Sequence, residues 1–307
     1  MQNSILLDLP DSLALVCHDA GASRLIFEWI RADATKQSNA TSNWCLLTQG
    51  PAVKLWSEYN LPQVRQCQTI HEVLSGAQVL ISGTGWASNL EYDSIRAARQ
   101  LGIKSIAVID HWTNYRPRFI RNGIEVLPDE LWVTDEYAKR LAEHEFKNVK
   151  VVQMPNLFLE RLVQEVRSND HQKSVGNNIL YLLEPIRDAW GDGVINGEFE
   201  ALDFFIENIE VLGMNSDLSI RLRPHPSDPM DKYNKWISKQ ENLKVILDKS
   251  PTLAESIMWS DVVVGCQTYA MVVALEAGKQ VFSSIPPWAP SCILPQEGIV
   301  KISELVQ

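Results

Sequence analysis

Short apolar runs rich in β-branched residues alternate with longer stretches of helical periodicity through the first half of the chain. The apolar runs predict strands at 13–17, 44–47, 79–82, 105–109, 130–133 and 149–153. Between them, the clearest helical patterns cover residues 24–34 and 89–101. Strands that alternate with helices in this way are typical of βαβ units, so the first half predicts a parallel sheet flanked by helices.

The alternation is interrupted once and then resumes. A predicted connecting helix at 157–166 is followed by the polar stretch SNDHQKSVGNN at 168–178, whose Ser, Asn and Gly content is typical of a linker. Further strands are predicted at 179–183, 218–222, 261–264 and 281–283, with helices over 199–212 and 270–277. The chain therefore predicts an α/β protein of two Rossmann-like domains, residues 1–155 and 156–307, with a ligand cleft between them.

Composition restricts the partners and the compartment. The 307 residues are 45% hydrophobic and 21% charged, and the formal net charge of −10 gives no electrostatic reason to bind nucleic acid. Five cysteines without a CxxC pair or metal-ligand spacing indicate reduced thiols, and neither a metal nor a cofactor is expected. The first residues lack a basic region, and no apolar run reaches the roughly 18 residues of a membrane span. We therefore expect a cytoplasmic protein without a transmembrane segment.

A rigid cationic segment follows the predicted strand at 218–222. Its sequence, RPHP, places Arg223 and His225 beside prolines that restrict the backbone. Arginine grips phosphate through paired hydrogen bonds, and histidine can donate a hydrogen bond or a proton to a departing phosphate. We expect Arg223, His225 and Pro226 to bind a nucleotide phosphate, with His225 also catalytic. The alternative is a proline-stiffened surface turn.

A second nucleotide-binding segment is predicted after the strand at 261–264, where a short turn that begins with a glycine leads into the next helix. The free amides in the first turn of a helix favour anions, and a carboxylate further along could contact ribose hydroxyls. Plain capping of the helix is the alternative. The residues expected to bind the nucleotide here, or after the strand at 179–183, are Glu184, Gly265, Gln267, Thr268, Tyr269 and Glu276.

The strand ends of the first half carry the candidate acceptor side. Asp19 follows the first strand in the turn HDAGAS at 18–23, where it could take a proton from an acceptor hydroxyl or only cap the next helix. Glycine and alanine in this turn let a ligand approach the backbone closely. The residues expected to contact the acceptor or the sugar are His18, Gly21, Thr84, Gly85, Trp86, Asp110, His111 and Arg118.

Several common enzyme classes lack their motifs in this chain. The turn GTGW at 83–86 is not a dinucleotide fingerprint, because Ser88 stands where GxGxxG needs its third glycine. The GxSxG, HExxH and Walker A patterns are absent, which argues against the common hydrolases, zinc proteases and P-loop enzymes.

Three short motifs carry a resemblance to a known family. They are Asp19-Ala20-Gly21, His225-Pro226 and either Gln267-Thr268 or Ser283-Ser284. With them the chain resembles bacterial GT-B-type glycosyltransferases, closest to the group that transfers sialic acid and other nonulosonic acids from CMP-sugars. The resemblance covers nearly the whole chain, although Ala20 stands where that group often has a second acid.

The resemblance implies a reaction as well as a fold. It implies transfer of a nonulosonic acid, such as a sialic, pseudaminic or legionaminic acid, from a CMP-sugar to a hydroxyl of a glycan or protein in surface-glycan synthesis. In that reaction Asp19 takes the acceptor proton, while His225, Arg223 and the helix after Gly265 stabilise the leaving phosphate without a metal.

Two other functions stay open at this point. A UDP-sugar hydrolase or 2-epimerase would keep the fold and use His18 or Asp19 to activate water or to abstract a proton. A non-catalytic nucleotide-sugar-binding subunit would keep the ligand and show no turnover.

Overall fold

The computed structural model describes residues 5–36, 40–61, 64–168, 176–187, 189–191, 195–214, 217–229 and 231–306. The chain forms two compact units, Met1–Phe158 and Leu159–Gln307, here called unit 1 and unit 2. The boundary falls at the start of helix α6 (Leu157–Ser168), where the sequence predicts a connecting helix. Most of the predicted linker, residues 169–175, lies outside the described residues.

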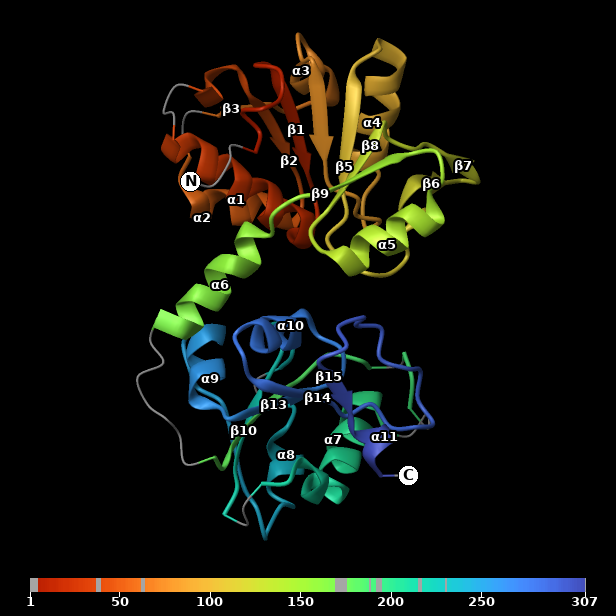
Figure 1. The fold of residues 1–307 in the computed structure, drawn as a ribbon. Coiled ribbons are helices and arrows are strands. Elements are labelled where there is room, and N and C mark those ends of the chain that lie inside the picture. The colour runs from red at the N-terminus through yellow and green to blue at the C-terminus, as the bar shows by residue number, and fades with distance from the viewer. Residues whose placement is uncertain are drawn as a thin grey trace. The chain divides into compact units, whose positions relative to one another are not determined.

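Unit 1 contains a seven-stranded sheet with the strand order β3-β2-β1-β4-β5-β8-β9 (Figure 1). Every pair in this sheet is parallel, so all of its strands end at the same edge. Its strands are β1 (Leu13–Cys17), β2 (Cys45–Thr48), β3 (Arg65–Gln66), β4 (Val79–Ser82), β5 (Lys104–Val108), β8 (Glu130–Val133) and β9 (Lys150–Gln153).

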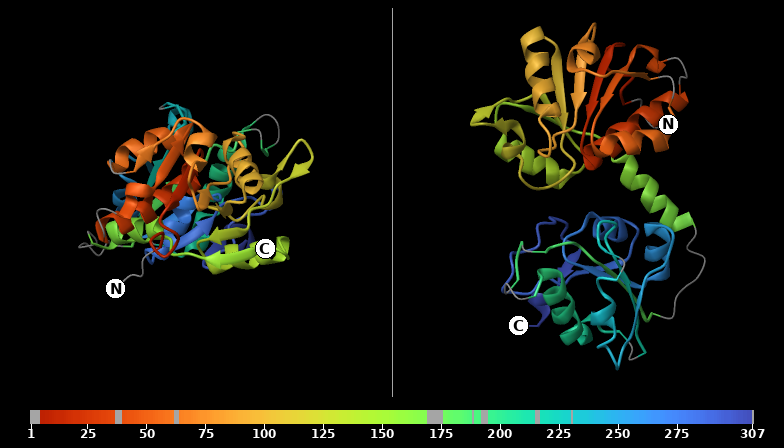
Figure 2. Two further views of the ribbon diagram at one scale, coloured as in Figure 1. Left: turned by 90° about the horizontal axis from the view of Figure 1, so that it is seen from above. Right: turned by 180° about the vertical axis from the view of Figure 1, so that it is seen from behind.

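Helices connect these strands and lie beside the sheet in the two further views of Figure 2. They are α1 (Ala20–Lys36), α2 (Pro51–Tyr59), α3 (Ile70–Leu74), α4 (Leu90–Leu101) and α5 (Glu136–Glu145). Short 3₁₀ helices cover Ala40–Asn43 and Arg116–Phe119. A separate hairpin joins β6 (Ile120–Arg121) to β7 (Ile124–Glu125), and its turn residues Asn122 and Gly123 both have positive φ, as a type I′ turn requires.

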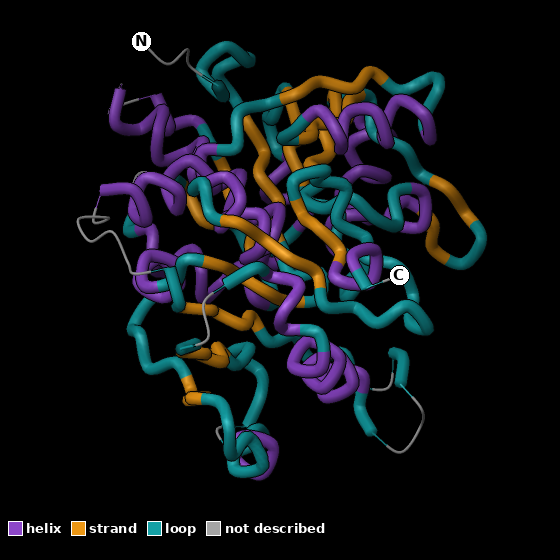
Figure 3. Tube along the Cα trace, turned by 60° about the horizontal axis from the view of Figure 1, so that its bottom comes forward, coloured by secondary structure: helices purple, strands orange, loops and turns teal. Residues whose placement is uncertain are grey.

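Unit 2 contains a six-stranded parallel sheet with the order β12-β11-β10-β13-β14-β15. Figure 3 draws the helices in purple and the strands in orange. The strands are β10 (Asn178–Leu182), β11 (Ser219–Arg223), β12 (Lys244–Leu247), β13 (Val262–Gly265), β14 (Gln280–Ser283) and β15 (Ile299–Lys301). The helices are α7 (Gly197–Glu207), a 3₁₀ helix at Ile209–Leu212, α8 (Asn234–Ile237), α9 (Leu253–Trp259), α10 (Tyr269–Glu276) and α11 (Ile302–Leu305).

Both sheets have the doubly wound order of Rossmann folds, in which the chain builds outward from one central strand and then returns to its other side. This confirms the predicted fold class of two Rossmann-like sheets. Central strands such as β4 and β13 are buried throughout, which is why their sequences are nearly continuous apolar runs. No described helix is long and apolar enough to cross a membrane.

Local chemistry explains several element boundaries. The Asp135 carboxylate accepts the Ala138 amide at 2.7 Å and begins α5, and the Thr252 hydroxyl accepts the Glu255 amide at 3.2 Å and begins α9. The core of unit 1 joins α1 to the sheet, because Trp29 is fully buried and its ring lies 5.6 Å from that of Trp132. Burying such a ring contributes about 2–3 kcal/mol to folding.

Two predicted boundaries are wrong. Helix α1 begins at Ala20 and not at residue 24, because the Asp19 carbonyl accepts the Ser23 amide at 3.3 Å and closes a first helical turn. Gly21 therefore lies inside a helix and not in an open turn. Arg223 is the last residue of β11 and not part of the loop that follows, because its strand pairs with β10 up to Leu182.

Candidate functional site

Ligands of doubly wound sheets bind outside the carboxyl ends of the strands, where the strand order reverses. In unit 1 this point lies between β1 and β4, and in unit 2 it lies between β10 and β13. Most of the predicted site residues lie at or near these points, whereas Glu276 lies at the far end of α10. Those of the first half follow β1, β4 and β5, and those of the second half follow or end β10, β11 and β13.

The first two residues after β1 form a hydrogen-bonded pair. His18 Nδ1 and Asp19 Oδ1 are 2.6 Å apart, and the side chains are 14% and 31% exposed. A carboxylate that accepts Nδ1–H leaves Nε2 of a neutral imidazole as the proton acceptor. Gly50, at φ +56°, packs against this ring: a Cβ there would lie 2.6 Å from Nε2 and 2.8 Å from Cε1. The Asp19 carboxylate and Gly50 thus hold the His18 ring in place at a strand end.

Sequence reasoning missed Glu91, in the first turn of α4. One carboxylate oxygen accepts the His18 amide at 3.0 Å, and the other accepts the Gly85 amide at 2.5 Å. Glu91 is 1% exposed. An acid in the first turn of a helix is commonplace, and nothing in the sequence points to a partner 73 residues away.

Burial raises the pKa of Glu91 to about 7. Loss of solvation is the largest cause, and the nearby Asp19 carboxylate adds to it. The amides of His18 and Gly85 oppose it, because they donate to the charged form. Glu91 therefore exchanges a proton near neutral pH, immediately behind the His18–Asp19 pair.

A second ionic contact follows β5. Arg118 Nη1 lies 3.2 Å from Asp110 Oδ1 and 3.2 Å from Thr84 Oγ1, and its guanidinium carbon lies 5.4 Å from the centre of the Trp86 ring. Trp86 is 52% exposed, whereas the Arg118 side chain is 9% exposed. The structure thus brings Thr84, Trp86, Asp110 and Arg118 together, and their contact with an acceptor or a sugar stays a prediction.

Two glycines make room for the two aspartates. A Cβ on Gly21 would lie 1.6 Å from Asp110 Oδ2, and a Cβ on Gly85 would lie 1.9 Å from Asp19 Oδ2. Each glycine therefore accommodates a carboxylate of the protein itself. A direct approach of ligand to Gly21 or Gly85 stays a prediction.

His111 follows Asp110 in the sequence, but its side chain contacts Thr113 and Trp112. Its Nδ1 is 3.3 Å from the Thr113 hydroxyl, and its ring centre is 5.3 Å from that of Trp112. Burial lowers the pKa of His111, so its imidazole is neutral at physiological pH.

His225 presents one ring nitrogen to solvent in unit 2. The Ser227 amide donates to its Nδ1 at 3.2 Å, and the Ser227 hydroxyl lies 2.8 Å from the same atom. An Nδ1 that accepts a backbone amide places the proton of the neutral ring on Nε2. His225 and Pro226 are exposed on the loop after β11, so Nε2–H is available to a phosphate oxygen.

Arg223 is engaged inside unit 2. Its Nη1 lies 2.7 Å from Asp248 Oδ2, 2.6 Å from the Ser256 hydroxyl and 3.1 Å from the Ser250 carbonyl. The Asp248 side chain is fully buried. Arg223 thus neutralises a buried carboxylate that follows β12, a strand the sequence analysis missed. Its predicted phosphate contact stays a prediction.

The start of α10 is partly occupied by a protein carboxylate. Glu184, just after β10, accepts the Gln267 amide at 3.0 Å, and burial raises its pKa. Thr268 is the N-cap residue of α10, but its hydroxyl makes no cap hydrogen bond. Gly265 ends β13, and Tyr269 begins α10.

The alternative Ser283-Ser284 motif is closed to ligands. Both residues are at most 1% exposed, and their hydroxyls donate to the carbonyls of Cys266 and Gly265 at 2.7 and 3.3 Å. Thr268 is half-buried, which leaves Gln267-Thr268 as the accessible pair. Glu276 is exposed at the last position of α10, about 10 Å along the helix axis from its first turn. That position separates Glu276 from an anion at the helix start.

A buried ionic cluster fixes the loop that carries His225. Lys232 Nζ lies 2.8 Å from Asp228 Oδ1 and 2.5 Å from Glu198 Oε1, and both carboxylates are 1% exposed. The Tyr233 hydroxyl donates to Asp228 at 2.9 Å. Asp228 belongs to the His225 loop, so the cluster ties that loop to the start of α7.

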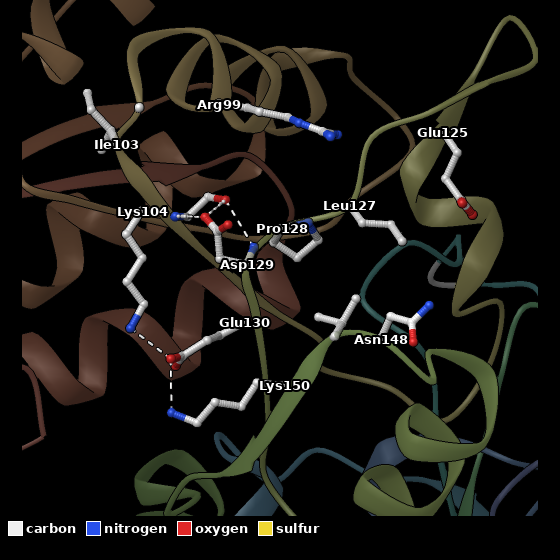
Figure 4. A pocket seen from close by; sticks show the side chains of 13 residues that line it. Arg99, Ile103, Lys104, Glu125, Leu127, Pro128, Asp129, Glu130, Asn148 and Lys150 are labelled. Carbon is white, nitrogen blue, oxygen red and sulfur yellow. Dashed lines mark hydrogen bonds and ion pairs between the residues drawn. The ribbon is translucent and has the colours of Figure 1, made fainter.

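A cavity of about 790 Å³ lies at the opposite edge of the unit 1 sheet (Figure 4). Its walls include Lys104, Glu130 and Lys150, the first residues of β5, β8 and β9. Both lysines pair with Glu130, at 2.7 and 3.0 Å. Since the strands are parallel, this cavity is remote from the strand ends that carry His18 and Asp110.

Comparison with known proteins establishes the fold. No family model and no curated protein matches the chain. A candidate UDP-N-acetylglucosamine 2-epimerase from Listeria monocytogenes is similar, with 14% identity, a TM-score of 0.58 and coverage of 89% of this chain and 79% of that chain. The UDP-GlcNAc 2-epimerase from Neisseria meningitidis, bound to UDP-GlcNAc, has 12% identity, a TM-score of 0.51 and coverage of 84% and 78%. The glycotransferase of kitacinnamycin has 14% identity, a TM-score of 0.52 and coverage of 92% and 81%. At these identities the similarity is one of fold: two Rossmann-like sheets, as in GT-B proteins.

Replacement of Glu91 by Gln tests the buried carboxyl. Because the folded-state pKa is raised, the folded protein binds this proton more tightly than the unfolded chain does. The Glu91 contribution is therefore favourable at low pH and is lost as the pH rises from about 4.5 to about 7. The free energy of unfolding of wild type minus that of Glu91→Gln should fall by about 3 kcal/mol over this window. Urea denaturation at several pH values measures it, and a constant difference would contradict the assignment.

Replacement of Lys232 by Met tests the unit 2 cluster. It leaves Glu198 and Asp228 buried without their cation, so we expect a loss of about 3–5 kcal/mol in the free energy of unfolding. The matched control is Lys301→Met, which breaks an exposed pair with Glu304 and should cost less than about 1 kcal/mol. Equal losses in the two variants would refute a structural role for the cluster.

Proposed function

We propose that the chain is a nucleotide-sugar-dependent glycosyltransferase. The observation that carries the proposal is the His18–Asp19 pair, a hydrogen-bonded proton acceptor at the strand end where doubly wound folds bind ligands. The Asp110–Arg118 contact and the exposed Trp86 beside it suit a polar acceptor or sugar, because aromatic rings pack against sugar faces while charged groups bind hydroxyls.

The proposed reaction forms one C–O bond and breaks another. The acceptor hydroxyl oxygen attacks the anomeric carbon, and its proton passes to the His18–Asp19 pair. The bond between the anomeric carbon and the phosphate oxygen breaks, and its electrons leave with the nucleotide. His225 Nε2–H and the amides at the start of α10 would stabilise the charge on that phosphate.

UDP is the nucleotide to test first. The Neisseria 2-epimerase is described with UDP-GlcNAc bound, and this supports a UDP-sugar for a chain of similar fold. The CMP-linked nonulosonic acid donor rests on the sequence resemblance alone and is the second nucleotide to test. The predicted cytoplasmic location and a glycan or protein acceptor likewise remain part of this proposal.

A 2-epimerase or UDP-sugar hydrolase is the second candidate function. Two of the similar structures are described as 2-epimerases. The carboxyl groups of Asp19 and Asp110, which follow neighbouring strands of the unit 1 sheet, could also move protons on a sugar. Product analysis separates the candidates, because a transferase yields a glycoside, a hydrolase a free sugar and an epimerase an isomer.

Nucleotide binding is the first property to measure. We expect UDP to raise the thermal midpoint, since a ligand at 100 times its Kd adds about 2.7 kcal/mol to the free energy of unfolding. His225→Ala should weaken that binding about 10- to 100-fold, because a phosphate contact is lost. The control is His144→Ala, an exposed histidine of α5. Stabilisation by CMP alone would favour a CMP-sugar as the donor. No response to either nucleotide would refute the proposed function.

Turnover tests the proton acceptor. Asp19→Asn should keep nucleotide affinity and reduce turnover at least 100-fold, because Asn cannot take the proton or stabilise a protonated His18. Asp93→Asn, a partly exposed acid of α4 that pairs with Arg96, is the control. Near-normal turnover in Asp19→Asn would remove Asp19 from the mechanism, and unchanged nucleotide binding without any turnover in wild type would favour the non-catalytic binding subunit.

A further inference from the structure

We propose that Glu91 is a positioning residue: its carboxylate joins the amide of His18 to the amide of Gly85, an arrangement called here the clasp, and so sets the geometry of the His18–Asp19 pair. The inference rests on the proposed function for its catalytic consequence. Its structural part stands on contacts within unit 1.

The clasp is built from two backbone hydrogen bonds. Glu91 accepts the amide of His18, the residue before Asp19, and the amide of Gly85. Gly85 is the surface against which Asp19 lies, since a Cβ there would sit 1.9 Å from Asp19 Oδ2. The Glu91 side chain therefore fixes two backbone segments: the one that carries His18 and Asp19, and the one at Gly85 against which Asp19 packs.

A carboxylate is suited to this position for a steric and an electronic reason. Gly83 leaves space for it, because a Cβ on Gly83 would lie 2.2 Å from Glu91 Oε1. Two buried amides require two acceptors, and a carboxylate supplies both from one side chain. Glutamine has the same shape but offers one acceptor and two donors, so an amide would face an N–H group at one of the two contacts.

The energetic cost of this arrangement argues for a role beyond stability. Burying a carboxyl group that no cation neutralises opposes folding, as the raised pKa of Glu91 reflects. The titratable groups around Glu91 are Cys17, His18 and Asp19, and they belong to the end of β1 and to the pair itself.

Displacement of the pair by even 1 Å can cost a reaction about 100-fold in rate. The loss should fall on kcat, because the residues proposed to bind the nucleotide lie in unit 2. We expect Glu91→Gln to lower kcat for a nucleotide-sugar donor at least tenfold, with the donor KM within about twofold of wild type. Asp93→Asn, a partly exposed acid in the same helical turn, is the control and should leave both parameters unchanged.

Amide hydrogen exchange tests the clasp without turnover. In the wild-type protein, the His18 and Gly85 amides should exchange at least tenfold more slowly than the amide of Trp86, the next residue after Gly85. In Glu91→Gln, at least one of the two should exchange at least tenfold faster than in wild type. Equal wild-type rates for Gly85 and Trp86 would overturn the proposal even if the variant failed to fold.

The outcomes separate this inference from the proposed function. If wild type binds no UDP or CMP and turns over no donor, the proposed function fails, while the exchange rates still decide whether Glu91 clasps the loops. If wild type is active and folded Glu91→Gln keeps its kcat, the positioning role is refuted and the proposed function stands.

Discussion

All of the candidate chemistry of this protein depends on one constraint, the parallel pairing of strands in two doubly wound sheets. All strands of a parallel sheet run in the same direction, so they all end at the same edge, and long crossover connections return the chain to the start of the next strand. The order reverses between β1 and β4 in unit 1 and between β10 and β13 in unit 2, and the connections there diverge to opposite faces. The loops that diverge carry His18, Asp19, Glu184 and Gln267. Residues distant in sequence therefore meet at two points set by topology.

Buried charge is the second theme of the structure. Glu91 is satisfied by two backbone amides, Asp248 by Arg223 and two serine hydroxyls, and Asp228 by Lys232 and Tyr233. A buried charge without such partners would cost several kcal/mol, so each carboxylate is enclosed by donors. The donors to Glu91 and to Asp248 come from different segments of the chain, so these carboxylates fix the relative positions of the segments. The donors to Asp228 are its own neighbours, and Lys232 links them to Glu198 of α7.

The same strand ends suit more than one sugar reaction. Transfer, hydrolysis and epimerisation all need a proton acceptor near the sugar and a site for the nucleotide phosphate. The similarity to a glycotransferase and to 2-epimerases is one of fold, and it does not choose among these reactions. What differs among the reactions is the group that reaches the anomeric centre or its neighbour, and this is a matter of site chemistry and not of fold.

The amino-acid sequence by itself determined the fold class, because continuous apolar runs, alternating with helical periods, encode parallel strands through local propensity and burial. Strands such as 13–17, 79–82 and 130–133 coincide with β1, β4 and β8. Short elements such as β12 and β15 escaped, since four or fewer residues on the outer part of a sheet carry little periodic signal. The sequence also predicted that the candidate residues follow the ends of strands. Only the tertiary structure decided which of them are exposed and which are engaged by other parts of the protein. Arg223 pairs with Asp248. Ser283 and Ser284 are buried. The Glu91 carboxylate accepts the amide of His18, a residue 73 positions away in the sequence. These outcomes depend on contacts between distant segments, and side-chain type alone does not specify them.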